Sequence, residues 1–216
     1  MTDQTVLKAP LVGGGYAEPR ASDESILLAN QRSGVNYVDA KAGRIFSQAN
    51  TPLGIAIPLY TATDLLGCIV LKNPEGSGVN VDIVEWAAAW ASGTSAFASV
   101  GIMVRPYNTT TLSAIVQSTP FNAKSFGGNA SVIHSANAGQ QTVSAGVAAD
   151  WKRTIGNMNL EADTGTAHGL IPGICYRPEG SLILQPGTFA YLAATKASVA
   201  LFTQHVIWKE VPLVGA

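Results

Sequence analysis

Apolar runs of strand length, separated by short turns rich in Gly and Pro, are the feature that most limits how this chain can fold. Along residues 95–105 apolar side chains occupy both alternating faces, which is typical of a strand that is packed on both sides. Similar runs lie at residues 55–60, 65–72, 79–90, 181–184, 188–195 and 198–211. The pattern predicts an all-β protein, an antiparallel β-sandwich of jelly-roll type.

Two turns connect these expected strands. Residues 72–78 (KNPEGSG) place Pro and Gly as in a type I turn, which predicts a hairpin between the runs on either side. Residues 185–188 (QPGT) suit a type II turn, and the last three runs are therefore predicted to form an antiparallel meander. The final run is long enough to cross a whole sheet, so we expect it inside the sandwich.

The chain divides into an N-terminal arm and a β-rich remainder. Residues 1–52 hold a triple glycine at 13–15, two prolines and only short apolar groups, which predicts an extended arm. The β-sandwich is expected over residues 53–216. Within it, residues 106–175 are rich in small polar side chains and are predicted to be a loop-rich insertion, with short strands at 112–116 and 143–147.

Charge is scarce and balanced. Asp, Glu, Lys and Arg make up 12% of the 216 residues, with a net charge of −1, where an ordinary soluble domain has about 25% charged residues. The chain therefore offers no basic field for a nucleic acid. No apolar run approaches the length of a membrane-spanning helix, and no secretory signal is recognisable. A surface this short of charge predicts burial against other subunits, and hence a homo-oligomer.

The sequence carries no recognisable catalytic motif. A nucleophile elbow, a phosphate loop, a dinucleotide fingerprint and a His-Glu-x-x-His motif are all absent, so we expect no enzyme and no cofactor. The three histidines, His134, His168 and His205, lack metal-ligand spacing, and no metal site is predicted. His205 lies within the final expected strand and is expected to be a half-buried or interface histidine. Cys68 and Cys175 lie far apart in apolar stretches and are expected to be buried free thiols.

Four aromatic residues are the candidates for an interface: Trp86, Trp90, Phe202 and Trp208. Trp86 and Trp90 share a strand face because their spacing is even. Core packing or subunit contact explains such residues best, since aromatic side chains dominate both. The alternative is a platform of aromatic side chains that stack against sugar rings, formed by Trp86, Trp90, Trp151, Phe97, Phe202 and Trp208.

Three segments together resemble virion structural proteins of tailed bacteriophages. They are residues 42–50 (AGRIFSQAN), residues 71–81 (LKNPEGSGVNV), and residues 184–189 (LQPGTF) with the closing 206–212 (VIWKEVP). These motifs are turns and strand ends.

The resemblance implies a non-enzymatic role in assembly. Proteins of this class have a jelly-roll domain, are commonly homotrimers and bind the outer capsid shell as cement or decoration. The expected partners are thus the major capsid protein and further copies of the chain, with no nucleic acid and no membrane. The expected location is the outer surface of the virion, after synthesis in the host cytoplasm. A tail, spike or head-fibre module that recognises a host glycan is the alternative.

Overall fold

The computed structural model describes residues 36–61, 68–93, 98–106, 119–124, 130–136, 150–158, 173–196 and 200–213, together with four two-residue strands near the N-terminus. The chain forms two compact units, Met1–Val38 and Asp39–Ala216. In the first unit, β1 (Ala9–Pro10) pairs with β2 (Tyr16–Ala17), and β3 (Arg20–Ala21) pairs with β4 (Leu27–Leu28). One short helix, α1 (Tyr37–Lys41), precedes the strands of the second unit.

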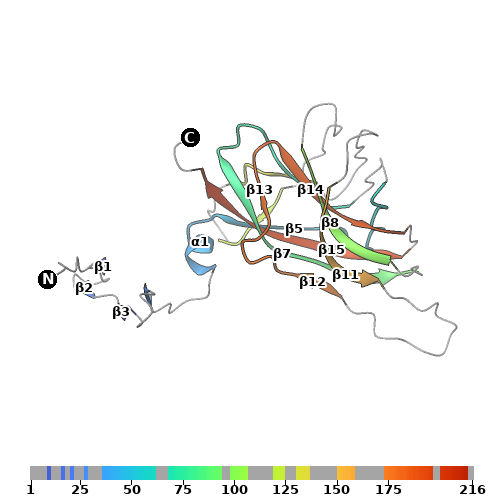
Figure 1. Ribbon diagram of the computed structural model, residues 1–216, viewed down its shortest axis with the longest axis horizontal. Coiled ribbons are helices and arrows are strands. Elements are labelled where there is room, and N and C mark those ends of the chain that lie inside the picture. The colour runs from blue at the N-terminus through green and yellow to red at the C-terminus, as the bar shows by residue number, and fades with distance from the viewer. Residues whose placement is uncertain are drawn as a thin grey trace. The chain divides into compact units, whose positions relative to one another are not determined.

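The second unit is a sandwich of two antiparallel sheets (Figure 1). The five-stranded sheet has the order β10-β6-β14-β8-β11, formed by His134–Ala136, Val70–Asn73, Thr188–Ala194, Ala98–Pro106 and Asp150–Met158. The six-stranded sheet has the order β12-β7-β15-β5-β9, formed by Ile174–Tyr176, Val79–Ser92, Leu201–Pro212, Ile45–Ala49 and Phe121–Asn122, and β13 (Ile183–Leu184) also pairs with β7. The predicted all-β sandwich is confirmed.

The strand order is that of a jelly roll. Eight strands build the frame, in chain order β5, β6, β7, β8, β11, β12, β14 and β15. In one sheet the first of these lies beside the eighth, the eighth beside the third and the third beside the sixth; in the other the order is second, seventh, fourth, fifth. This is the interleaving of two Greek keys that defines the fold. Strands β9 and β10 extend the two sheets beside β5 and β6.

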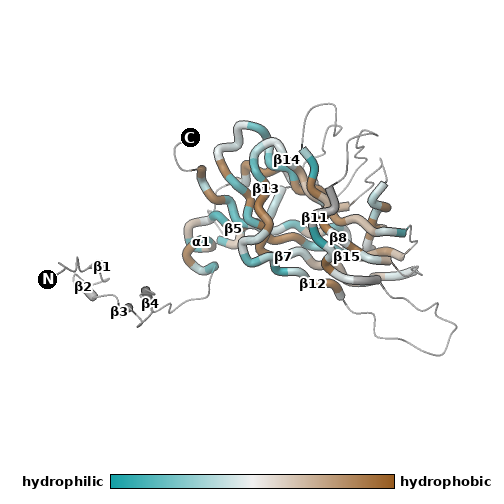
Figure 2. Tube along the Cα trace, viewed as in Figure 1, coloured by the Kyte–Doolittle hydropathy of each residue, from teal (hydrophilic) through white to brown (hydrophobic). Residues whose placement is uncertain are grey.

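Buried and half-exposed residues alternate strictly along β15, which explains why this segment forms a strand of the six-stranded sheet. Buried side chains at Phe202, Gln204, Val206, Trp208 and Glu210 alternate with half-exposed ones between them. Since side chains of a strand point to opposite faces in turn, one face of β15 lies in the core. The strand is central in its sheet, as expected for the final run. Figure 2 shows apolar stretches along the strands of both sheets, and their inner faces form one hydrophobic cluster.

Two local predictions are wrong for the same reason. The turn at residues 72–78 does not close a hairpin, because β6 and β7 belong to different sheets. The last three runs form no meander, since β13 and β15 lie in one sheet and β14 in the other. In this jelly roll most strands that follow each other along the frame lie in different sheets, and the exception is the pair β8 and β11. Asn73 stabilises the connection from β6 to β7 in the other sheet. Its side-chain amide donates hydrogen bonds to the carbonyls of Val79 and Leu184 at 2.9 and 3.0 Å.

The predicted domain boundaries also change. Strand β5 falls within the expected arm of residues 1–52, yet it pairs with β15 along five residues, so the sandwich begins before residue 53. The expected run at residues 55–60 contributes isolated bridges at Ile55 and Leu59 rather than a strand. The described part of residues 106–175 contains β9, β10, β11 and the start of β12, which are the edge strands of the two sheets. The strands expected at 112–116 and 143–147 lie outside the described residues.

The three central strands of the five-stranded sheet, β6, β14 and β8, are largely buried on both faces. Val100 and Ile102 of β8 point into the sandwich, while Met103 on the opposite face is equally inaccessible to solvent. Strand β14 is likewise buried at six consecutive positions from Phe189. The outer face of the six-stranded sheet, in contrast, is partly open to solvent.

Candidate functional site

The outer face of the six-stranded sheet is the most distinctive exposed surface of the described chain. Register pairs place Cys175, Ala87, His205 and Ala49 in one row across β12, β7, β15 and β5. Thr203 pairs with Ala89 in the row beyond it. Because paired residues point to the same face, small side chains cover the middle of this surface. We call it the outer face of the six-stranded sheet throughout.

A β-bulge in β7 places one carboxylate on this face. Ile207 pairs with Glu85 and Trp208 pairs with Ile83, which leaves Val84 without a partner in β15. If β7 alternated regularly through Val84 with no bulge, Glu85 would have the same orientation as Ile83 and would point into the core. The bulge keeps both Ile83 and Trp86 buried and turns Glu85 outward.

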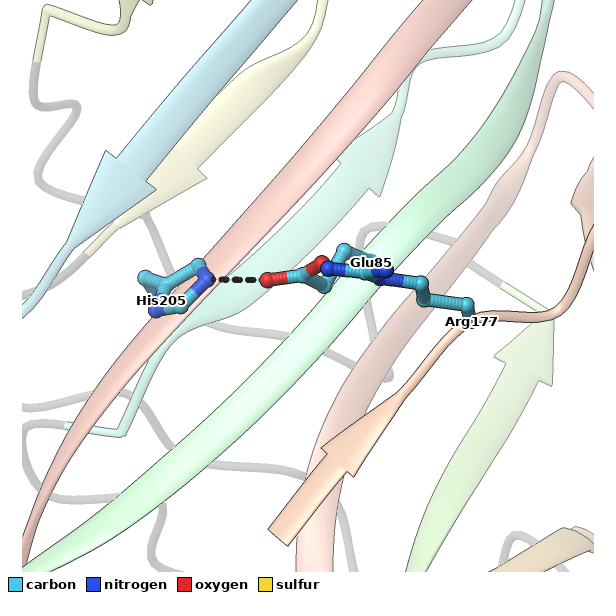
Figure 3. Close-up of polar contacts among 3 residues, drawn as sticks. All are labelled: Glu85, Arg177 and His205. Atoms are coloured by element: carbon cyan, nitrogen blue, oxygen red, sulfur yellow. Dashed lines mark hydrogen bonds and ion pairs between the residues drawn. The ribbon is translucent and has the colours of Figure 1, made fainter. Parts of the chain in front are cut away.

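Glu85 bridges two basic side chains (Figure 3). Its Oε1 lies 2.8 Å from Nε2 of His205 on β15, and its Oε2 accepts a hydrogen bond from Nε of Arg177 at 2.6 Å. The hydrogen bonds from His205 and then from Arg177 lower the pKa of Glu85 from its ordinary value of 4.5, against the smaller opposing effect of burial. Glu85 is therefore a carboxylate at neutral pH, held by His205 of β15 and by Arg177, which directly follows β12.

The other charges of this face are also paired with one another. Nζ of Lys209 lies 3.5 Å from carboxylate oxygens of both Asp39 and Asp82. Asp39, in α1, also contacts Arg44 at 3.7 Å. Since each of these carboxylates has a cationic partner, the face has little net charge. Such a surface favours a partner that is itself poor in charge.

Exposed apolar side chains lie at both edges of the same face. Phe121 of β9, 61% exposed, pairs with Ser47, which in turn pairs with Ile207. Ile183 of β13, 50% exposed, pairs with Asp82 at the opposite edge. The register therefore assigns both side chains to the outer face. Small residues between two apolar edges make a surface that can be buried against another protein at low desolvation cost.

Three of the four aromatic interface candidates lie in the core. Trp86 and Trp208 have no solvent exposure and Phe202 has 3%, so their side chains are not available to a partner. Trp90 is 40% exposed, and its Nε1 donates to the carbonyl of Gly93 at 3.0 Å. The even spacing of Trp86 and Trp90 does give them the same orientation, but the core ends before Trp90. A shared sugar-stacking platform of these tryptophans is therefore not formed.

The remaining candidate residues divide between core and surface. Cys68 and Cys175 are free, as expected, but Cys175 is exposed because it points outward from the edge strand β12, which corrects its expected burial. Among the described residues, no group of three or more His, Cys, Asp or Glu is placed to hold a metal ion. In that same part of the chain, no helix has the length and apolarity needed to cross a membrane. The side chain of His134 and all of His168 lie outside the described residues.

The sequence identified only one member of the charged cluster. His205 was recognisable as a half-buried or interface histidine within a strand, and the structure confirms its partial exposure. Glu85 carried no signal, because nothing in the run at residues 79–90 marks the bulge at Val84. Arg177 follows β12, a three-residue strand that begins in the segment predicted from the sequence to be rich in loops.

Comparisons of the chain with protein-family models, with curated proteins and with solved structures found no match.

Glu85→Gln should remove a stabilisation that depends on pH. A carboxylate whose pKa is lowered on folding stabilises the protein above its unfolded pKa, and this contribution is lost as pH falls through the folded value. We therefore expect the wild type to be more stable than the variant at neutral pH, and the difference to shrink below pH 4.5, the ordinary pKa. Urea unfolding of both proteins across the acid range measures this difference.

Comparing wild type with Glu85→Gln also removes the effect of Glu210, whose pKa shift has the opposite sign. Burial raises the pKa of Glu210, so its contribution falls as pH rises, but it does so in both proteins. A difference between wild type and Glu85→Gln that stays constant with pH would show that the bridge to His205 and Arg177 does not lower the pKa of Glu85.

Proposed function

We propose that this chain is a viral structural protein, a capsid cement or decoration protein that binds the outer capsid shell and stabilises it through subunit contacts. The proposal rests on the resemblance of three segments to virion structural proteins of tailed phages, and on a fold and surface that suit assembly. In this reading the protein works as a homotrimer by burying surface, without chemistry at a catalytic centre.

The observation that supports the proposal most is the outer face of the six-stranded sheet. It combines small side chains, internally paired charges and exposed Phe121 and Ile183 at its two edges. Burying apolar area contributes about 25 cal/mol per Å², and repeated contacts in a trimer multiply modest affinities. A face whose charges are paired with one another is suited to a neighbouring protein that is itself poor in charge.

Removing the two apolar edges should weaken capsid binding. We expect the double variant Phe121→Ser with Ile183→Ser to fold like the wild type, because both side chains are exposed, and to bind stripped capsids at least tenfold more weakly. Co-sedimentation with capsids freed of accessory proteins measures the affinity. Leu53→Ser is the matched control, since Leu53 is 80% exposed in a turn outside this face. Equal affinity of the double variant and the wild type would contradict the assignment of this face.

The arm is tested separately by truncation. Deleting residues 2–35 leaves α1 and the contacts of Asp39 with Arg44 and Lys209 in place. The resemblance implies an extended N-terminal arm that ties neighbouring capsomers, and we propose this role for residues 2–35. The truncated protein should then keep its oligomeric state and lose capsid affinity. Full retention of affinity would remove the arm from the proposed mechanism.

A glycan-binding module of a tail, spike or head fibre is the second candidate. The half-exposed ring of Trp90 favours it, because the hydrogen bond to Gly93 fixes the indole while leaving part of its surface open. Aromatic faces of this kind stack on sugar rings. Glycan-array binding that is abolished by Trp90→Ala, together with no binding to capsids, would favour this function over the first.

A further inference from the structure

His205 lies near the middle of the outer face of the six-stranded sheet. In its row, Ala87 of β7 is on one side and Ala49 of β5 is on the other. Thr203 and Ile207, two residues away along β15, point to the same face. The side chain of His205 is 44% exposed. Because both neighbours in the row are alanines, a partner that covers this face must bury the imidazole.

The contact with Glu85 assigns the hydrogen atom of the neutral imidazole (Figure 3). Nε2 of His205 lies 2.8 Å from Oε1 of Glu85. Glu85 is ionised at neutral pH because its two partners lower its pKa. A carboxylate accepts hydrogen bonds and cannot donate them, so Nε2 carries the hydrogen atom and Nδ1 has the free lone pair. Nδ1 is therefore the atom that takes up a proton when the pH falls.

The described charged groups on the elements next to His205 are carboxylates and cations in equal number. They are Glu85 and Asp82 of β7, Asp39 of α1, Lys209 of β15, Arg44 just before β5, and Arg177 just after β12. Strands β5, β9 and β13 contain no titratable side chain, and β12 adds the thiol of Cys175 to this face. The six charges cancel while the imidazole is neutral. Protonation of Nδ1 therefore gives the described part of this face one unbalanced positive charge.

We propose that protonation of His205 weakens the binding of the capsid to the outer face of the six-stranded sheet, which makes this contact sensitive to pH. This inference rests on the capsid-binding function proposed above. A partner poor in charge can cover the face at neutral pH, when the described charges cancel. At acid pH the same partner would bury an imidazolium, and Glu85 is already bound to Arg177. Burying a charge that is not fully compensated is costly, so the complex dissociates more readily.

Co-sedimentation with stripped capsids at pH 7.5 and pH 5.5, at constant ionic strength, tests the proposal. We expect the wild type to bind about tenfold more weakly at pH 5.5, because histidine side chains titrate in this range and only molecules with a neutral imidazole bind well. His205→Gln keeps an amide that can donate to Glu85 but cannot take up a proton. Its ratio of affinities at the two pH values should therefore report only the titration of the capsid, and the wild-type ratio should exceed it by about tenfold.

His134→Gln is the matched control for this experiment. His134 belongs to β10 of the five-stranded sheet, so this variant should keep the wild-type ratio of affinities. Circular dichroism at both pH values shows whether each protein stays folded. If the wild type and His205→Gln bind capsids with equal ratios, the pH-sensitive contact is refuted while the proposed function stands. If the wild type does not bind capsids even at pH 7.5, the proposed function fails and this inference fails with it.

Discussion

Trp208→Ala is expected to lower the free energy of unfolding by about 3–5 kcal/mol. Trp208 has no solvent exposure, lies on the central strand β15 and stacks on Phe46 of β5, with ring centroids 5.9 Å apart. Removing the indole leaves a large cavity between the sheets that this frame can fill only in part. Urea unfolding followed by circular dichroism measures the change.

Trp90→Ala is the control for that experiment. The same substitution at a tryptophan that is 40% exposed removes far less buried surface, so we expect a cost of about 1 kcal/mol or less. The two tryptophans thus distinguish core from surface. If both substitutions lower the free energy of unfolding equally, the assignment of Trp208 to the core and of Trp90 to the surface would be wrong.

Gly54→Ala is the second substitution with a large expected effect. Gly54 has φ +76°, and an added Cβ would lie 2.8 Å from Cβ of Ala91 and 3.1 Å from the backbone nitrogen of Phe202. That nitrogen donates to the carbonyl of Ile55, so the backbone there has little freedom to move. Backbone strain of about 1–2 kcal/mol adds to an overpacking cost of about 1–3 kcal/mol.

Gly76→Ala isolates the steric part of this cost. Gly76 has the same φ of +76°, but an added Cβ would meet no atom within 4 Å. Only the backbone strain of about 1–2 kcal/mol should therefore remain. Thermal or urea unfolding of the two variants gives the difference directly. Equal destabilisation would show that the contact between the Gly54 turn and β7 is loose.

The fold class was predictable because alternation is a local property. Residues 95–105 and 198–211 alternate so regularly that β8 and β15 follow from the sequence alone. Pairing was less predictable. Pro74 and Gly76 mark a turn, but a turn between strands of one sheet and a corner between two sheets have similar residues. The edge strands β9, β10 and β12 are two or three residues long, too short for any periodic signal.

The candidate site depends on a β-bulge and on a long-range contact, neither of which can be seen in the alternation of apolar and polar residues. A single extra residue, Val84, reverses the orientation of everything after it in β7 and brings Glu85 beside His205. Period-two reasoning from Val81 would have placed Glu85 in the core. Arg177 reaches the same carboxylate only because the fold brings β12 beside β7. Contacts between residues 92 positions apart arise from topology, which local patterns do not specify.

Mixing the purified protein with capsids stripped of accessory proteins, after measuring its own mass by light scattering, tests the proposed function most directly. The proposal predicts a homotrimer that sediments with the capsids and saturates a fixed number of sites. A monomer that remains in the supernatant would contradict it, and the glycan-binding function suggested by Trp90 would then be the one to pursue.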